Sequence, residues 1–196
     1  MADQKGLAAV GICGRIGAGK DTVADMLMEL APGKFHRYAI ADPIRRIARD
    51  VFGFTDLQLG DHALKEQVDP FWDMTPRRFM QLVGTELFRE RLDRRVWIKL
   101  AGRKMLEHAD RHLLIPDIRT RDEVQMVKDS GGVLVKVTRP GYEAPAAAQA
   151  HATEGGISDD LVDIQVDNSG TQEDLMSAVL AALPRILDLV EGEGRR

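Results

Sequence analysis

The stretch Gly14-Arg-Ile-Gly17-Ala-Gly19-Lys20 decides the fold of this chain. It has the form G-x-x-x-x-G-K, it follows an apolar run from Leu7 to Cys13, and it precedes apolar residues at helical spacing. Glycine is needed in such a loop because backbone amides must converge on phosphate oxygens in conformations that side chains block. The pattern predicts a strand, a phosphate-binding loop and a helix whose N-terminus faces the phosphates.

The residue after the lysine departs from the usual form of this loop. Serine or threonine commonly stands there and gives its hydroxyl to Mg²⁺, whereas this chain has Asp21 followed by Thr22. We expect Lys20 to bind the β- and γ-phosphates, Asp21 to hold the metal ion directly or through water, and Thr22 to donate to a phosphate or bind the ion. The alternative for Asp21 is a first-turn acid that only complements the helix dipole.

The composition is that of one folded α/β domain. The chain has 196 residues, of which 44% are hydrophobic and 30% charged, and its formal charge of −4 provides no global positive field for nucleic acid or a membrane surface. No apolar stretch reaches the roughly 20 residues of a membrane helix. The single cysteine, Cys13, excludes an internal disulfide, and the N-terminus lacks a secretory signal, so we expect a cytoplasmic protein.

Strand and helix patterns alternate along the rest of the chain. Further strands are predicted at 35–41, 112–116, 133–137 and 161–166, and helices at 21–30, 44–52, from 76, at 96–109, from 120 and at 171–190. Residues 53–74 lack a clear period and are expected to form a loop or a short helical insert. The alternation predicts a mostly parallel sheet covered on both faces, the three-layer α/β/α form of a P-loop domain.

A helix that opens at Thr75-Pro76 carries the first group of candidate acceptor-binding residues. Its polar residues recur every four positions and are expected to form one strip, which comprises Arg77, Gln81, Thr85 and Arg89. Arg77 would bind an acceptor phosphate bidentately, and Gln81 would read a base edge with its amide. The alternative for each is a solvated helix face.

Other candidates stand where predicted strands end, at the edge where open α/β sheets bind ligands. Asp42 is expected to meet the acceptor's sugar or phosphate, with a plain turn aspartate as the alternative, and Arg45 follows on the next helix. Asp117 has the position of a Walker B carboxylate that would hold Mg²⁺ through water. Arg119, just beyond it, would reach the acceptor phosphate.

These motifs together resemble the phage-type deoxynucleoside monophosphate kinases over roughly residues 7–183. The matching segments follow that family's order: Gly19-Lys-Asp-Thr22, Ala41-Asp-Pro43, Gln81-x-x-Gly-Thr-Glu86, Asp117-Ile-Arg119, Arg139-Pro140, His151-Ala-Thr-Glu154 and Asn168-Ser-Gly170. The resemblance implies ATP and Mg²⁺, with a deoxynucleoside monophosphate as acceptor. It also implies an acceptor-binding insert at about 43–110 and a lid at about 139–156, whose Arg139 closes over the triphosphate. His151 and Glu154 match the pattern without a role that we can derive.

The predicted site thus has three groups of residues. Catalysis is assigned to Lys20, Arg119 and Arg139. ATP binding is assigned to Gly14, Gly17, Ala18, Gly19, Lys20, Asp21, Thr22, Asn168 and Gly170, where the last two would hold the adenine unless they form an ordinary turn. Acceptor binding is assigned to Asp42, Arg45, Arg77, Gln81, Thr85 and Arg119, and metal binding to Asp21, Thr22 and Asp117.

Two other functions stay open on the sequence alone. Kinases for phosphomevalonate or dephospho-coenzyme A are similar to parts of the same pattern, and a nucleotide-binding module without catalysis is the second alternative. The Asn-Lys-x-Asp guanine reader of a GTP switch is absent. Base and sugar preference, the role of Arg15 and the oligomeric state, a homodimer included, stay open. We expect Trp72 and Trp97 to be core residues rather than base-stacking residues.

Overall fold

The computed structural model describes residues 8–61, 63–142 and 157–192. The chain divides into two compact units, which we call the sheet unit (residues 1–39 and 101–196) and the helical unit (residues 40–100). Helix α5 (Val96–Glu107) begins in the helical unit and ends in the sheet unit. That the helical unit is the predicted acceptor-binding insert stays a prediction.

In the residues that the structure describes, the sheet unit contains five parallel strands in the order β2-β3-β1-β4-β5. Their bounds are β1 (Ala9–Cys13), β2 (Phe35–Arg37), β3 (His112–Ile115), β4 (Val133–Thr138) and β5 (Ile164–Asp167). Central β1 pairs on both sides, with Gly11 opposite Ile115 of β3 and opposite Leu134 of β4. The predicted parallel sheet is confirmed, and because all strands run the same way, the segments that follow them emerge at one edge.

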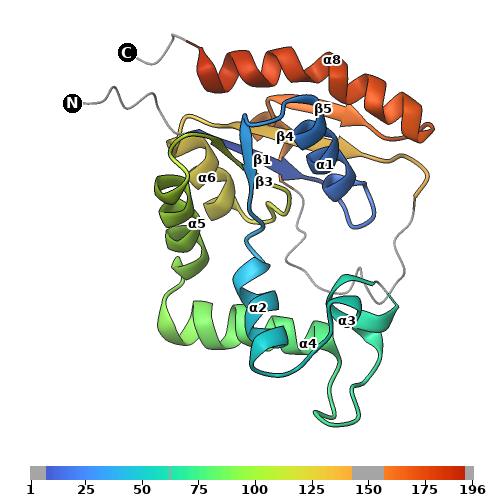
Figure 1. The fold of residues 1–196 in the computed structure, drawn as a ribbon, viewed down its shortest axis with the longest axis vertical. Helices are drawn as coiled ribbons and strands as arrows, with labels where there is room; N and C mark the ends of the chain where they lie inside the picture. Colours follow the sequence, from blue (N-terminus) through green and yellow to red (C-terminus); the bar gives the residue numbers. More distant parts are fainter. Residues whose placement is uncertain (1–7, 62, 143–156, 193–196) are drawn as a thin grey trace. The chain divides into compact units, whose positions relative to one another are not determined.

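Helices cover both faces of this sheet, as predicted (Figure 1). On one face α1 (Lys20–Leu30) and α8 (Gln172–Glu191) pack together, and their Leu27 and Val179 share a buried core with Val10 of β1. On the other face α6 (Arg121–Asp129) packs so closely that a β-carbon on Gly11 would lie 2.9 Å from Cγ2 of Val127. No helix in the described part of the chain is long and apolar enough to cross a membrane.

The predicted helix starts at Thr120 and Thr171 are capping boxes in the structure. At α6 the Thr120 hydroxyl accepts from the Glu123 N–H at 3.3 Å, while the Glu123 carboxylate accepts from the N–H groups of Thr120 and Arg119 at 3.0 and 2.7 Å. Glu123 is only 1% exposed. A buried carboxylate is tolerated here because backbone donors satisfy it.

The sheet unit departs most from the predicted strands at two places. The strand expected at 35–41 ends at Arg37, and beyond its end the Tyr38 N–H still donates to the Leu114 carbonyl at 2.9 Å. The strand expected at 161–166 begins later, at Ile164, because Asp159–Leu161 forms a 3₁₀ turn. Both errors lie at element ends, where an apolar pattern alone does not set the boundary.

The helical unit begins with α2 (Asp42–Asp50), followed by α3 (Asp56–Gly60) and a 3₁₀ turn at Leu64–Glu66. Residues 53–74 therefore contain short helices, one of the two forms expected for them. The start of α3 was detectable, because Thr55 and Gln58 form a capping box that the sequence displays as Thr-x-x-Gln. The next helix, α4 (Pro76–Gln81), begins as predicted with Thr75 as its cap and proline at its first position.

The helix after Pro76 changes its geometry at Leu82. From Leu82 to Leu92 it is a π-helix, in which each carbonyl bonds to the N–H five residues on, as in the bond from the Asp93 N–H to the Phe88 carbonyl at 2.9 Å. Across this change of geometry Arg77, Gln81, Thr85 and Arg89 are all half-buried. The single polar strip predicted from them stays a prediction.

Trp97 anchors this π-helical segment from within the helical unit. Its indole N–H donates to the Gly84 carbonyl at 2.8 Å, and the side chain is 2% exposed, which confirms the expectation of a core residue. Gly84 has no room for a side chain, since a β-carbon would lie 2.7 Å from Cδ1 of Ile44 on α2. Trp72 differs from the expectation: its side chain is 37% exposed and its indole donates to the Phe52 carbonyl at 2.7 Å.

The sheet unit contains a stacked histidine pair that should make its stability depend on pH. The ring of His36 on β2 lies 3.5 Å from that of His108, centroid to centroid. Partial burial, and after it the nearby positive charge of His108, Arg111 and Lys104, lower the pKa of His36, with Asp110 opposing. Because the folded protein resists protonation of His36, its contribution to stability is present above the ordinary histidine pKa of 6.5 and is lost as the pH falls below it.

We therefore predict that His36→Gln reduces the loss of unfolding free energy between about pH 7.5 and about pH 5.5. Urea denaturation of both proteins at the two pH values measures this difference. Equal losses in the wild type and the variant would show that His36 does not carry the effect.

Candidate active site

The phosphate loop follows β1 at the carboxyl edge of the sheet. Three of its glycines have positive φ: Gly14 at 146°, Gly17 at 76° and Gly19 at 96°. A β-carbon on Gly14 would lie 2.4 Å from the Val137 carbonyl oxygen of β4. Glycine is thus required at position 14 because other residues rarely adopt this backbone conformation and because a side chain has no room. This agrees with the reason for which the sequence motif contains glycine.

Lys20 is the first residue of α1, directly after the cap Gly19. Its ammonium donates to the carbonyls of Gly14 and Arg15 at 2.7 and 2.9 Å, so the side chain folds back over its own loop. The positive end of the helix dipole and the N–H groups of the first turn lie beside this ammonium. The loop therefore combines a mobile cation with the amide donors that bind phosphate.

The ends of β4 and β5 support the loop from the neighbouring strands. The Asn168 side-chain amide donates to the Ala18 carbonyl at 2.8 Å, and its Nδ2 would lie 2.5 Å from a β-carbon on Gly19. Arg139, after β4, donates to the Gly17 carbonyl at 3.5 Å. Among the predicted nucleotide-binding residues, Asn168 is therefore in contact with the loop itself. The structure gives its amide a role in bracing that loop, and adenine binding stays a prediction.

Gly170 has a structural role at the start of α8. A β-carbon there would lie 2.6 Å from Oδ2 of Asp174, the carboxylate that caps the helix with Thr171. Its contribution to nucleotide binding stays a prediction.

Tyr142 is a neighbour of the loop that the sequence analysis missed. A β-carbon on Gly17 would lie 2.1 Å from Cε1 of Tyr142, so the ring rests directly against this glycine. The Arg139 guanidinium lies 5.1 Å from the ring centroid, within the range of a cation–π contact. A signal was present, since Tyr142 follows the Arg139-Pro-Gly turn. The rest of the predicted lid, with His151 and Glu154, lies outside the described residues.

The predicted metal ligands bring oxygen donors to the same edge of the sheet. Asp21 lies in the first turn of α1, with 73% of its side chain exposed, and pairs with Arg37 at 2.5 Å. Asp117 is half-buried just after β3, and the adjacent Ile118 N–H donates to the Ile12 carbonyl of β1 at 3.1 Å. Carboxylates and the exposed Thr22 hydroxyl are donors that suit Mg²⁺, which kinases bind through one or two carboxylates and the substrate phosphates.

No group of three or more histidine, cysteine, aspartate or glutamate side chains suited to a metal ion occurs among residues 8–61, 63–142 and 157–192. Cys13, at the end of β1, is buried. Burial raises the pKa of its thiol to about 11, against the opposing effect of Lys136 and Lys20. The thiol therefore stays protonated at neutral pH and does not act as a nucleophile.

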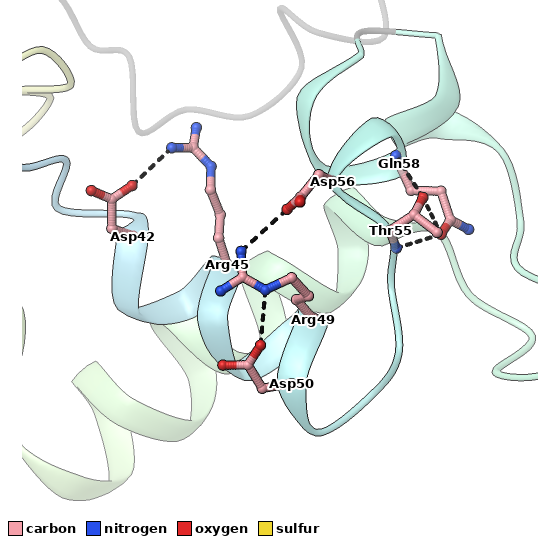
Figure 2. A network of polar contacts seen from close by, with 7 residues as sticks. All are labelled: Asp42, Arg45, Arg49, Asp50, Thr55, Asp56 and Gln58. Carbon is pink, nitrogen blue, oxygen red and sulfur yellow. Dashed lines mark hydrogen bonds and ion pairs between the residues drawn. The ribbon is translucent and has the colours of Figure 1, made fainter.

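The helical unit brings two predicted acceptor-binding residues together on α2. Arg45 Nη1 lies 3.2 Å from Oδ1 of Asp42, one turn earlier (Figure 2). On the same helix Arg49 pairs with Asp50 at 2.8 Å and with Asp56 of α3 at 3.3 Å. These contacts orient the charged side chains of α2 and leave about a third of the Arg45 side chain, 36%, accessible.

Arg77 is held by a carboxylate that the sequence did not point to. Its Nε donates to Glu66, in the 3₁₀ turn, and the Arg77 side chain is 20% exposed. The next arginine, Arg78, is 51% exposed and pairs with Glu86. The two neighbours thus differ in burial, and Arg77 is the one with a fixed, enclosed guanidinium. Gln81 and Thr85 are half-buried.

The family of the chain is shown by comparison with known proteins. The model of the deoxynucleotide monophosphate kinase family matches residues 58–179 of this chain. The chain belongs to this family. Curated relatives agree: a protein of Acanthamoeba polyphaga mimivirus, provisionally named for the same activity, is 29% identical over 90% of this chain and 96% of its own length.

Two phage members of the deoxynucleotide monophosphate kinase family are also similar. The enzyme of Enterobacteria phage T4 is 30% identical over 53% of this chain. The matched segment covers 43% of the phage T4 protein. That of Escherichia phage T5, a deoxynucleoside-5'-monophosphate kinase, is 23% identical over 76% of this chain and 84% of its own length.

Solved structures support the fold of this family member. A sugar kinase from a Janibacter species matches with a TM-score of 0.50 at 16% identity, over 95% of this chain and 99% of its own. A gluconokinase from Sinorhizobium meliloti matches with a TM-score of 0.50 at 14% identity, over 97% and 99%. At such identities the likeness concerns the fold alone, and it agrees with the predicted P-loop architecture.

We predict that Asn168→Asp lowers the affinity for a nucleoside triphosphate about tenfold, because the loop loses the donor to the Ala18 carbonyl and gains a negative charge beside it. Equilibrium binding of the triphosphate measures the change. Ser169→Ala is the matched control, since that hydroxyl bonds to Asp167 within the same turn at 2.8 Å and should leave the affinity unchanged. Equal effects of the two substitutions would contradict the bracing role.

Proposed function

We propose that this protein transfers the γ-phosphoryl group of ATP to a deoxynucleoside monophosphate and forms the diphosphate by direct in-line displacement. The observation that carries the proposal is a phosphate loop of kinase type in a chain that belongs to the deoxynucleotide monophosphate kinase family. The names of its viral relatives support a deoxynucleotide as the acceptor. Which bases are accepted is left to experiment.

The proposed chemistry is electrostatic. Phosphoryl transfer spreads negative charge over the moving group, so catalysis consists mainly of positioning and charge stabilisation. The amides of the loop and the ammonium of Lys20 bind the β- and γ-phosphates. Arg139, close to the loop at Gly17, and Arg119, whose backbone is fixed by Glu123, supply further positive charge to the transferred group.

Mg²⁺ is proposed as the accompanying ion, held by Asp21, Asp117 and Thr22 together with the nucleotide's phosphates. When bound, the ion would offset the negative charge that develops on the transferred phosphoryl group.

Acceptor binding is proposed for the helical unit. Arg77 binds the monophosphate through its guanidinium, and Glu66 keeps that group in one orientation, which lowers the entropy cost of binding. Gln81 and Thr85 follow on the same helix and are proposed to contact the base and sugar. The paired Asp42 and Arg45 are proposed to contact the acceptor's sugar and phosphate.

The proposed reaction predicts ADP release from ATP and Mg²⁺ only when a suitable acceptor is present. A panel of ribo- and deoxynucleoside monophosphates, with phosphomevalonate and dephospho-coenzyme A, tests this in a coupled assay. Turnover with one or more deoxynucleotides is expected, and Lys20→Ala should reduce kcat by at least about 10³-fold while the protein stays folded by circular dichroism. Turnover with a non-nucleotide acceptor alone would refute the assigned substrate class, and wild-type rates in the variant would refute the loop mechanism.

A second prediction separates acceptor from ATP binding. Arg77→Ala should raise KM for the monophosphate about 10- to 100-fold, the effect of losing a hydrogen bond between charged groups, and leave KM for ATP unchanged. Arg78→Ala is the matched control, because it removes the same charge from the next position, where the side chain pairs with Glu86 and is 51% exposed. Steady-state kinetics with each substrate varied in turn measures both constants. The assignment fails if both variants raise KM for the monophosphate equally.

A further inference from the structure

Arg37, the last residue of β2, contacts the first turn of the helix that follows the phosphate loop. Its Nη2 lies 2.5 Å from Oδ1 of Asp21, and its Nε lies 3.5 Å from Oδ1 of Asp25. The two carboxylates are one turn apart and share a face of α1. The Arg37 side chain is 34% exposed, compared with 73% for Asp21 and 71% for Asp25. The arginine is therefore the most buried of the three side chains.

Asp21 stands where this loop usually carries a neutral hydroxyl, directly after Lys20. A carboxylate at that position places a full negative charge next to the phosphates that the loop binds, and like charges a few ångströms apart repel even in a partly solvated site. The Lys20 ammonium donates to the carbonyls of Gly14 and Arg15. The guanidinium of Arg37 is a cation in direct contact with Asp21.

We infer that Arg37 is a positioning residue for nucleotide binding. It holds the Asp21 carboxylate and offsets its charge, and the loop thereby accepts a polyphosphate although an acid replaces the usual hydroxyl. Asp25 binds Arg37 from the adjacent turn and keeps the guanidinium at α1 whichever way Asp21 turns. The inference rests on the proposed function, since it takes ATP as the ligand of the loop.

A double-mutant cycle on ATP binding tests this role independently of catalysis. Isothermal titration calorimetry of the full chain with ATP, in EDTA and separately in MgCl₂, is carried out for the wild type, Arg37→Gln, Asp21→Asn and the double variant. In EDTA, Arg37→Gln should weaken ATP binding about fivefold, because the Asp21 charge is then uncompensated. The loss should be smaller in MgCl₂, since the ion offsets the same charge. In the Asp21→Asn background, Arg37→Gln should change the affinity by less than about twofold.

Lys34→Gln is the matched control for this cycle. It also removes one positive charge and one ion pair, that of Lys34 with Glu191 at 2.8 Å, but Lys34 precedes β2 at the opposite end of the strand. The affinity of the Lys34→Gln variant for ATP should equal that of the wild type. Thermal melting of every variant establishes that the binding constants refer to folded protein.

Two results would overturn the inference. Equal losses from Arg37→Gln in the Asp21 and Asp21→Asn backgrounds would mean that Arg37 contacts the nucleotide itself. No loss in either background would mean that Arg37 forms an ordinary surface ion pair. If ATP is not the ligand of the loop, the result is different, because the wild type would then bind no ATP in either buffer.

Discussion

The close approach of the phosphate loop to β4 is the constraint on which the rest of the site depends. Gly14 lies against the Val137 carbonyl with no room for a side chain, and its φ of 146° is one that other residues rarely adopt. The loop therefore stays at the edge of the sheet, where the segments after β3, β4 and β5 also emerge. Asn168 and Arg139 then contact loop carbonyls, and Lys20 and the start of α1 present positive charge on the same side.

Much of the sheet unit could be predicted from the sequence because its signals are local. The G-x-x-x-x-G-K motif, the apolar strand runs and the Thr-x-x-Glu box at Thr120 each depend on residues close together in the chain, and each has one physical reading. The family resemblance drawn from the order of the motifs is confirmed by the match over residues 58–179. The three-layer architecture follows from the alternation of strands and helices, since parallel strands need crossover helices on both faces.

The missed features depend on contacts between residues far apart in the sequence. The π-helical geometry after Gln81 accompanies the hydrogen bond from Trp97 to the Gly84 carbonyl. The spacing of residues within that helix does not predict this geometry. Arg37 meets Asp21 because β2 and α1 pack together, and Glu66 meets Arg77 only when the 3₁₀ turn folds beside α4. The sequence alone does not indicate which distant residue a single arginine or glutamate will pair with. The roles proposed for Arg37 and Glu66 therefore come from the structure.

The burial of Cys13 has a practical consequence for spectroscopy. It is the single cysteine of the chain, it is 1% exposed, and its thiol has a pKa of about 11, so maleimide reagents at neutral pH have almost no thiolate to attack. A cysteine introduced at an exposed position of the helical unit, such as Leu57→Cys where the native side chain is 72% exposed, would be labelled selectively with a fluorophore or spin label. A probe confined to the helical unit can thus be attached with the native thiol left in place.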